Sequence, residues 1–348
     1  NDPERRAADL TLAHANTPTI FRLDPLGRPY LQIEDNGAAG SYETQTDLDL
    51  LGNTVRVIDA RGLVVEERAL DMLGRTLRLR SPDSGEKWTF PNCVDASLRQ
   101  WDGRNFTVRW AYDVAQRHTH LFVRPPGEDW RLEEYLLYGE HHPQAEAENL
   151  RGQLHLQFDG AGVVRNLHFD LDGNLCRWER HLALDATTTP NWSALEIVTD
   201  PNQALVLAGP QLEGETFTTE SSYDALGRLV AERHPDGTEV RLSYHESSLL
   251  SRLETKLPGS SSFTDIISET EYNAKGQRLS ARFGTGIVTS YCYDKKTFRI
   301  RRMTSCRSSD DKVLQDLHFI YDPVGNIVEQ QDCAQQEVYF DNTVVSAK

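Results

Sequence analysis

Apolar and polar residues alternate in short runs along most of the chain. Val240, Leu242 and Tyr244, for example, are each separated from the next by one polar residue. The same alternation begins at Val108, Leu154, Leu167 and Leu317. A period of two places apolar side chains on one face of a β-strand, so the pattern predicts many short strands in an antiparallel sheet.

A recurring short unit separates these runs. It consists of Asp or Asn, two variable residues and Gly, often followed by Arg or Asn. The units begin at Asp24, Asp49, Asp59, Asp71, Asp159, Asp170, Asp224, Asn273 and Asp322. Several neighbouring glycines, such as Gly52 and Gly62 or Gly62 and Gly74, are 10 to 12 residues apart. This spacing leaves room between turns for strands of ordinary length.

The chemistry of the unit predicts a tight hairpin turn. An Asp side chain accepts hydrogen bonds from backbone amides of its own turn. Pro or a small residue suits the next position, and Gly in fourth place adopts positive φ at little cost. We therefore predict structural roles at Asp24, Gly27, Asp49, Gly52, Asp71, Gly74, Asp224, Gly227, Asn273, Gly276, Asp322 and Gly325. The predicted fold is all-β, built of repeated antiparallel hairpins.

Two stretches interrupt the strand pattern. Residues 138–153 are predicted to be an insertion, in which residues 143–150 could form a short helix. Residues 185–219 contain three prolines and few turn units, so we expect a long surface excursion. Neither stretch marks a domain boundary. The expectation is one continuous repeat segment over residues 1–348.

The charge of the chain narrows its possible partners. A net charge of −16 and an isoelectric point near 5.1 disfavour binding to nucleic acid or to an anionic membrane surface. No apolar run approaches the ~20 residues of a spanning helix, and the polar start does not resemble a signal peptide. The first residue is not Met and the last predicted strand lies close to the end. We therefore expect a fragment of a larger protein.

The cysteines and histidines do not predict a metal or disulfide framework. Five cysteines are an odd number, and no two form a Cys-x-x-Cys pair, so we interpret Cys93, Cys176, Cys292, Cys306 and Cys333 as buried thiols. His118 and His120 could chelate a metal with His141 or His142, but we interpret them as polar strand and loop residues. The sequence also contains no nucleophile elbow, phosphate-binding loop or zinc-protease motif. We predict no catalytic residue and no cofactor.

Three of the turn units carry a family resemblance. Tyr223-Asp-Ala-Leu-Gly-Arg-Leu and Tyr321-Asp-Pro-Val-Gly-Asn-Ile resemble the YD repeats of Rhs proteins, and the segment from Tyr272 is a close variant. Such repeats also occur in the B and C components of bacterial insecticidal toxin complexes and in animal teneurins. The order of features is most similar to the Rhs core of the toxin-complex group. These features lie at residues 14–30, 138–140, 149–152 and 314–317.

The resemblance covers roughly residues 17–340 and implies both a shape and a function. It implies a long sheet that spirals into a hollow shell and encloses a C-terminal toxin domain until delivery. The partners would be the remainder of the same shell, the enclosed toxin domain and other toxin-complex components. A bacterium would assemble the shell in its cytoplasm and then export it. We find neither the self-cleavage region nor the toxin domain of such families in residues 1–348, and expect no membrane insertion by this segment.

Two other classes of function remain open. Aromatic residues on the predicted sheet, such as Trp88, Trp101 and Trp110, could stack on sugars and make the chain an adhesion module for glycans or receptors. The alternative interpretation is that they form cross-strand pairs that stabilise the sheet. An enzyme is the third class, but no constellation of residues supports it.

Overall fold

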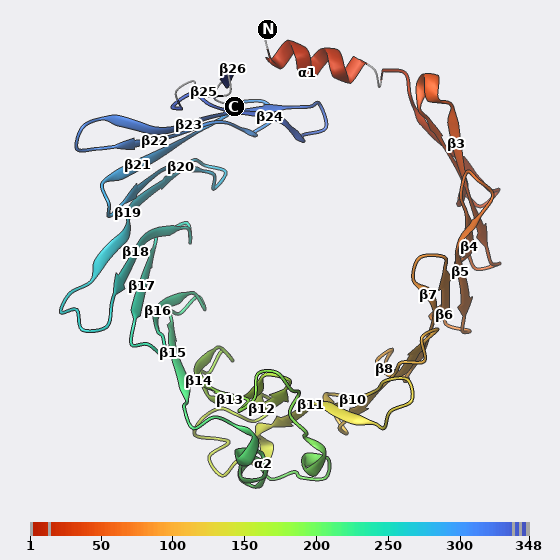
Figure 1. Ribbon diagram of the computed structural model, residues 1–348, viewed down its shortest axis with the longest axis vertical. Coiled ribbons are helices and arrows are strands. Elements are labelled where there is room, and N and C mark those ends of the chain that lie inside the picture. The colour runs from red at the N-terminus through yellow and green to blue at the C-terminus, as the bar shows by residue number, and fades with distance from the viewer. Residues whose placement is uncertain (1–2, 13–14, 336–337, 341–342, 346–348) are drawn as a thin grey trace. The chain divides into compact units, whose positions relative to one another are not determined.

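The computed structural model describes residues 3–12, 15–335, 338–340 and 343–345 (Figure 1). Strands dominate these residues, which confirms the predicted all-β fold of antiparallel hairpins. The chain divides into two compact units. One consists of residues 16–218, and the other combines residues 1–15 with residues 219–348. We call them the 16–218 unit and the 219–348 unit.

The 16–218 unit is an antiparallel meander in which each strand pairs with the next strand along the chain. Its strands are β1 (Thr19–Leu23), β2 (Pro29–Asp35), β3 (Ser41–Leu48), β4 (Thr54–Ile58), β5 (Val64–Leu70), β6 (Thr76–Ser81), β7 (Gly85–Pro91), β8 (Ser97–Asp102), β9 (Thr107–Tyr112), β10 (His118–Arg124), β11 (Arg131–Tyr138), β12 (Leu154–Asp159), β13 (Gly162–Phe169) and β14 (Leu175–Leu182). The helix α2 (Pro201–Ala208) follows β14. Short 3-10 helices span Gly37–Ala39, Gly139–His141, Ser193–Leu195 and Gly209–Gln211.

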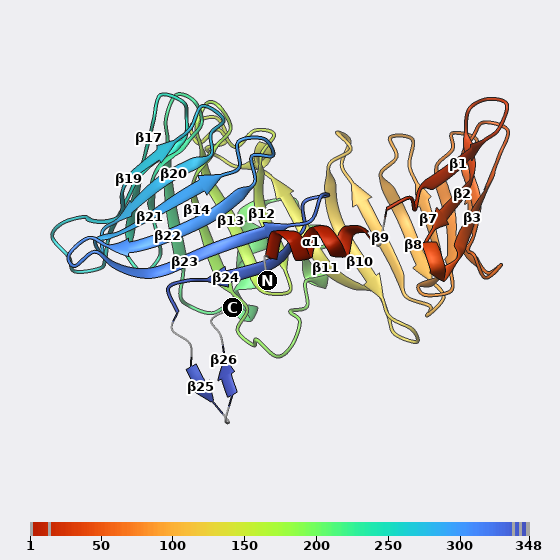
Figure 2. The same ribbon diagram turned by 90° about the horizontal axis from the view of Figure 1, so that it is seen from above.

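The 219–348 unit continues in the same way, with each strand paired to its successor. Its strands are β15 (Phe217–Tyr223), β16 (Leu229–Arg233), β17 (Glu239–Tyr244), β18 (Leu250–Lys256), β19 (Thr264–Tyr272), β20 (Arg278–Phe283), β21 (Ile287–Tyr293), β22 (Ile300–Arg307), β23 (Lys312–Tyr321) and β24 (Ile327–Asp332). A separate hairpin joins β25 (Val338–Phe340) and β26 (Thr343–Val345). The helix α1 (Pro3–Leu12) lies against β23 (Figure 2).

The alternation in the sequence explains the strands, with one local exception. In β17, half-buried Val240, Leu242 and Tyr244 alternate with exposed polar residues. The alternation that begins at Leu167 runs through Phe169 to Leu171, which predicts that Leu171 continues the apolar face of β13. It instead lies in the turn after that strand, with 93% of its surface exposed, because the chain has already left the sheet.

Over most of its length the sheet lacks a second layer. The described side chains are mainly half-buried, and the chain exposes 22311 Å² of surface for a mass of 39.4 kDa. A compact monomer of that mass exposes about 14,000 Å². The excess follows from strands whose two faces both remain partly accessible. No described helix is both long and apolar enough to cross a membrane.

The stretch expected to be a surface excursion instead folds over the 16–218 sheet, so that prediction was wrong. Its buried apolar residues are Trp192, Leu195, Val198, Ala204 and Ala208. They pack on Phe122, Leu132, Tyr135, Leu137, Leu156, Phe158 and Val163 of strands β10 to β13. We call residues 183–216 the cap. Polar groups also attach it to the sheet, because the Trp192 indole N–H donates to the Asp159 carbonyl over 3.0 Å and the Tyr135 hydroxyl donates to the Val198 carbonyl.

The helices also differ from the prediction. Residues 143–150 form successive turns, not a helix, and Leu150 is fully buried in a small cluster with Ala145 and Phe169. Asn149 adopts a positive φ of 53°, which interrupts any helical path. The helix in the cap begins where Asp200 accepts a hydrogen bond from the Gln203 amide, and Pro201 occupies its first turn. Asp before Pro is a helix-start signal that was present in the sequence.

The cap should contribute strongly to the stability of the 16–218 unit. We expect Trp192→Ala to lower the free energy of unfolding of this unit by about 3–5 kcal/mol, because it removes a buried aromatic side chain. Urea unfolding followed by circular dichroism measures this loss. Ile197→Ala is the matched control, since Ile197 lies in the same cap but is 90% exposed. Equal stability of the two variants would show that the cap does not hold the sheet.

On the face of β12 opposite Leu156 and Phe158, His155 is a buried titratable side chain. Only 1% of its surface is exposed, and its Nδ1 donates to the Asn166 carbonyl at 2.7 Å. The buried Nε2 has no hydrogen-bond partner, and the His142 ring lies 4.7 Å away. Burial, opposed by the hydrogen bond to the Asn166 carbonyl and assisted by His142 and Arg165, lowers the pKa of His155 to about 4. The folded protein therefore holds this imidazole neutral.

Acid should destabilise the 16–218 unit through His155. The unfolded state binds the proton near the ordinary pKa of 6.5, whereas the folded state resists it down to about 4. Stability is therefore complete above pH 6.5 and falls between 6.5 and 4, by on the order of 3 kcal/mol. Urea unfolding at a series of pH values should show a smaller loss in His155→Asn. Exposed His141→Asn should keep the wild-type profile, and an unchanged profile in His155→Asn would contradict the assignment.

Candidate functional site: the rows of Asp-Gly turns

The turn at Asp224 shows how the repeated unit closes a hairpin. The Gly227 amide donates to the Asp224 carbonyl at 2.9 Å, and the Asp224 amide donates to the Arg228 carbonyl at 2.9 Å. The Asp224 carboxylate accepts from the Leu226 amide at 2.9 Å and from the Arg228 amide at 3.0 Å. Its second oxygen accepts from Arg228 Nε at 2.7 Å. One carboxylate thus accepts hydrogen bonds from two backbone amides of the turn and from the guanidinium of Arg228, which ends the turn.

The other predicted turn residues occupy equivalent places. Each of Asp24, Asp49, Asp71 and Asp322 accepts a backbone hydrogen bond from the residue four positions later, as does the Asn273 amide oxygen. All six predicted glycines have positive φ, from 72° at Gly227 to 111° at Gly325. The strand register shifts by one residue beside these turns, for example between Ser222 and Tyr223. The architectural role of these residues remains a prediction that substitution can test.

Asp159 and Gly162 do not form this turn, although the sequence grouped them with the others. The two residues face each other as the last pair of β12 and β13, so only two residues connect the strands. The Asp159 carboxylate instead binds Arg180 of β14, at 2.7 Å and 3.1 Å. Gly162 is needed for a different reason, because a Cβ there would lie 2.1 Å from the His181 carbonyl oxygen.

The glycine pattern also missed turns of the same kind that lack glycine. In the turns that begin at Asn92 and Asp113, the residues with positive φ are Asp95 (65°) and Gln116 (61°). Asn92 and Asp113 bind their own backbone as the other first residues do. The signal that could have revealed them is an Asp or Asn followed four residues later by a strand, without regard to glycine.

The residue after the positive-φ position joins one turn to the next turn at the same end of the strands. Arg75, for example, binds its own Asp71 and also donates from Nη1 to the Asn92 carbonyl at 2.8 Å. Comparable links run from Arg28 to the Leu50 carbonyl, from Arg117 to Glu140, from Arg228 to Ser248, from Gln277 to the Phe298 carbonyl and from Arg299 to the Asp322 carbonyl. The sequence showed that Arg or Asn recurs at this position but did not assign it this role.

A tyrosine at the end of a neighbouring strand supports the same link. The Arg228 guanidinium lies over the Tyr244 ring, 4.6 Å from its centroid, and the Tyr244 hydroxyl donates to the Leu229 carbonyl at 2.7 Å. Arg117 lies over Tyr138 in the same way, at 3.9 Å. Each such tyrosine stands at the end of a strand, next to the following turn. The Asp, Arg and Tyr side chains of these hairpins therefore form rows of linked turns along one side of each unit.

Hydrogen bonds in these rows stabilise the ionised form of the Asp carboxylates. The hydrogen bond from the Arg228 side chain lowers the pKa of Asp224, and backbone hydrogen bonds at the turn lower it further. The pKa of Asp24, Asp71 and Asp322 is lowered for similar reasons. These carboxylates are ionised at neutral pH, and their oxygens already accept hydrogen bonds. Such groups suit a structural role better than acid–base catalysis.

The cysteines and histidines lie differently from the expectation. Cys93, Cys292 and Cys333 are exposed and Cys176 and Cys306 are half-buried, so the interpretation as buried thiols was wrong. The cysteines lie in strands and turns of a single-layered sheet, which offers few fully buried positions. The rings of His118 and His120 lie next to Glu134 and to the Glu196 carbonyl, respectively. Among the described residues, the three that approach as metal ligands are Asp316, His318 and Cys333.

A substitution at Gly227 tests the turn assignment. We expect Gly227→Val to lower the free energy of unfolding by on the order of 1–3 kcal/mol, because a β-branched residue is strained at φ 72°. Gly214→Val is the control, since Gly214 lacks a positive φ and a Cβ there meets open space. Thermal unfolding of the two variants measures the difference. A Gly227→Val midpoint equal to that of the control would contradict the assignment.

Comparisons with known proteins place these features in context. No family model matches the chain. The toxin subunit YenC2 of Yersinia entomophaga is 29% identical over 226 residues, which cover 63% of this chain and 22% of that subunit. The toxin subunit YenC1 of the same organism is 25% identical over 279 residues, or 78% of this chain and 28% of the subunit.

Solved structures show the same relationship in three dimensions. The crystal structure of TcdB2–TccC3 matches 99% of this chain with a TM-score of 0.86 and 26% identity, and the match covers 17% of that chain. TcdB2–TccC3 without its hypervariable C-terminal region matches 98% of this chain with a TM-score of 0.85. This chain thus spans less than a third of the length of each of these relatives. The predicted resemblance is confirmed in both sequence and fold: the chain is similar to subunits of bacterial toxin complexes, and its sheet of antiparallel hairpins matches theirs.

Proposed function

We propose that this chain is wall material for a toxin-complex shell and has no catalytic activity of its own. In this proposal it forms one part of a longer shell that encloses a C-terminal toxin domain. The shell keeps that domain away from proteases and from its targets until delivery. The chain would be assembled in a bacterial cytoplasm and exported as part of the complex.

The observation that carries the proposal is the match of 99% of the chain to one part of TcdB2–TccC3. The physical properties of the chain agree with it. A wall must cover area with little protein, and a single-layered sheet with 22311 Å² of accessible surface does so. The wall must also be continuous, which the pairing of each strand with its successor provides within each unit and the rows of linked turns reinforce. Lining a cavity in this way needs no convergent catalytic groups.

A chimera tests the proposal directly. The segment of TcdB2–TccC3 that matches this chain would be replaced by residues 1–348. We expect the chimera to assemble to the native size and to protect the hypervariable C-terminal region of TccC3 from added protease, because the substituted wall is continuous. Gel filtration and limited proteolysis followed by mass spectrometry measure both properties.

A weakened wall is the matched control for the chimera. The same chimera with Gly52→Val and Gly227→Val strains one turn in each unit, at φ 96° and 72°, and should lose protection faster. Full-size chimeras that are digested equally fast with and without these substitutions would argue against a wall function.

An adhesion module is the second candidate, and one groove favours it. Phe90, Arg99, Trp101 and Arg124 line a groove of about 560 Å³ in the 16–218 unit. Phe90 is 57% exposed and Trp101 is 37% exposed, so both rings could stack on a sugar. Trp101 also stacks on Trp88 of the adjacent strand, with ring centroids 6.1 Å apart, which accounts for it as a cross-strand pair. Saturable binding on a glycan array that is lost in Trp101→Ala would favour adhesion over the wall.

A further inference from the structure

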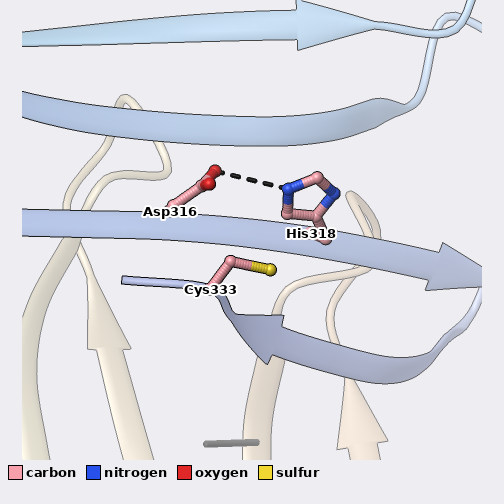
Figure 3. Close-up of side chains that lie close together, drawn as sticks. All are labelled: Asp316, His318 and Cys333. Carbon is pink, nitrogen blue, oxygen red and sulfur yellow. Dashed lines mark ion pairs between the residues drawn. The ribbon is translucent and has the colours of Figure 1, made fainter. Parts of the chain in front are cut away.

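Three potential metal ligands meet on one face of the 219–348 sheet (Figure 3). Asp316 and His318 are two positions apart on β23, so their side chains leave the strand on the same face. Cys333 follows the end of β24, and its amide donates to the Asp316 carbonyl at 2.8 Å. One oxygen, one nitrogen and one sulfur of these residues all lie within 4.8 Å of one another.

The spacing of these atoms fits zinc. The distance from Asp316 Oδ1 to His318 Nε2 is 3.4 Å. In a tetrahedral zinc site, ligand bonds of about 2.0–2.3 Å place neighbouring ligand atoms about 3.3–3.7 Å apart. The sulfur needs only a small shift to reach this range. Cys333 is exposed, so its side chain can rotate without disturbing a packed core.

The backbone around the cluster is fixed before any ion binds. The Asp332 carboxylate, which is buried, accepts from the Asp316 amide at 2.9 Å and from the Ala334 amide at 3.1 Å. These two hydrogen bonds hold the chain on both sides of Cys333 against β23. Asp316 is itself oriented by Arg302, whose Nε and Nη2 donate to its two oxygens at 2.6 Å and 2.9 Å. Partners outside the ligand set often orient metal ligands in this way.

The charge of Asp316 and the open groove beside the cluster also suit the binding of a cation. Arg302 lowers the pKa of Asp316, so the carboxylate is ionised. The Thr304 hydroxyl bonds Asp316 Oδ1 over 3.3 Å, which is long enough for an ion to displace it. His318 and Cys333 line a groove of about 910 Å³ that is open to solvent. An ion can therefore enter from one side, and a water molecule can complete the coordination.

We propose that Asp316, His318 and Cys333 bind one zinc ion and thereby fasten the end of β24 to β23. On binding, the Cys333 thiol releases its proton to solvent and the thiolate joins the neutral His318 imidazole and the Asp316 carboxylate. Coordination of this kind links two strands whose contact otherwise depends on backbone hydrogen bonds and on the Asp332 carboxylate. The site lies outside the rows of turns and is independent of the proposed wall function.

Cobalt and zinc titrations of the reduced 348-residue chain test the proposal. We expect one equivalent of Co²⁺ to give a sulfur-to-metal charge-transfer band that zinc abolishes. Competition with a chromophoric chelator should show zinc affinity at least tenfold lower in Cys333→Ser and in His318→Gln, since each removes one of three ligands. Zinc should raise the thermal midpoint of the wild type and leave that of Cys333→Ser unchanged. Circular dichroism verifies that both variants fold.

Two other exposed cysteines provide matched controls. Cys292→Ser alters a thiol in the same groove, on β21, where Cys292 pairs with Arg302 of β22. Cys93→Ser alters an exposed thiol in the 16–218 unit. Both variants should bind zinc like the wild type. The proposal is overturned if the wild type binds less than one equivalent without a sulfur band. It is also overturned if Cys333→Ser binds normally or if either control loses binding.

Discussion

The hydrogen bonds accepted by the Asp or Asn side chain of each repeated turn are the interactions on which the rest of this molecule depends. A four-residue turn leaves backbone amides without strand partners, and the Asp side chain accepts two of them. It also binds the Arg, Asn or Gln side chain that begins the next strand, as Asp224 does with Arg228. Because that side chain reaches the following turn on the same edge, closing one hairpin also positions its neighbour. The sheet is thus held together along the ends of its strands as well as by backbone pairing.

This arrangement explains how a sheet can be extensive without a thick core. Most strands contribute half-buried side chains to a single layer, so hydrophobic burial per residue is modest. The cap over β10 to β13 is the main exception among the described residues, with Trp192 and Leu195 almost fully buried. His155 lies on the opposite face of β12 from Leu156 and Phe158, against His142, and its burial there holds the imidazole neutral. The loss of stability that His155 causes between pH 6.5 and 4 is therefore expected in the 16–218 unit, whereas the turn carboxylates with lowered pKa lie in both units.

A wall function and a zinc site make different demands on the same sheet. The proposed wall requires continuity, which the repeated turn residues supply at many positions of low individual importance. The proposed zinc site requires three particular side chains at one place, and it would secure β24, which pairs with β23 and with no other described strand. The similarity to TcdB2–TccC3 concerns the sheet, while the cluster rests on this chain's own residues.

The sequence by itself determined the strands and the glycine-containing turns, because both depend on local chemistry. Alternation sets which face a strand buries, and Asp followed three residues later by Gly specifies a turn through its own backbone, as at Asp24, Asp71 and Asp322. Turns that place Asp95 or Gln116 at positive φ escaped the pattern, because other residues can adopt that conformation when neighbouring strands compensate for the strain.

Only the tertiary structure decided how distant residues meet. The cap was misread as a surface excursion because its apolar residues have no strand-like period, and their burial depends on β10 to β13. The link from Arg75 to Asn92 and the cluster of Asp316, His318 and Cys333 both join positions that are adjacent only once the strands pair in register. Each turn sets the register of its own hairpin only, so contacts between side chains far apart in the sequence appear only in the folded sheet.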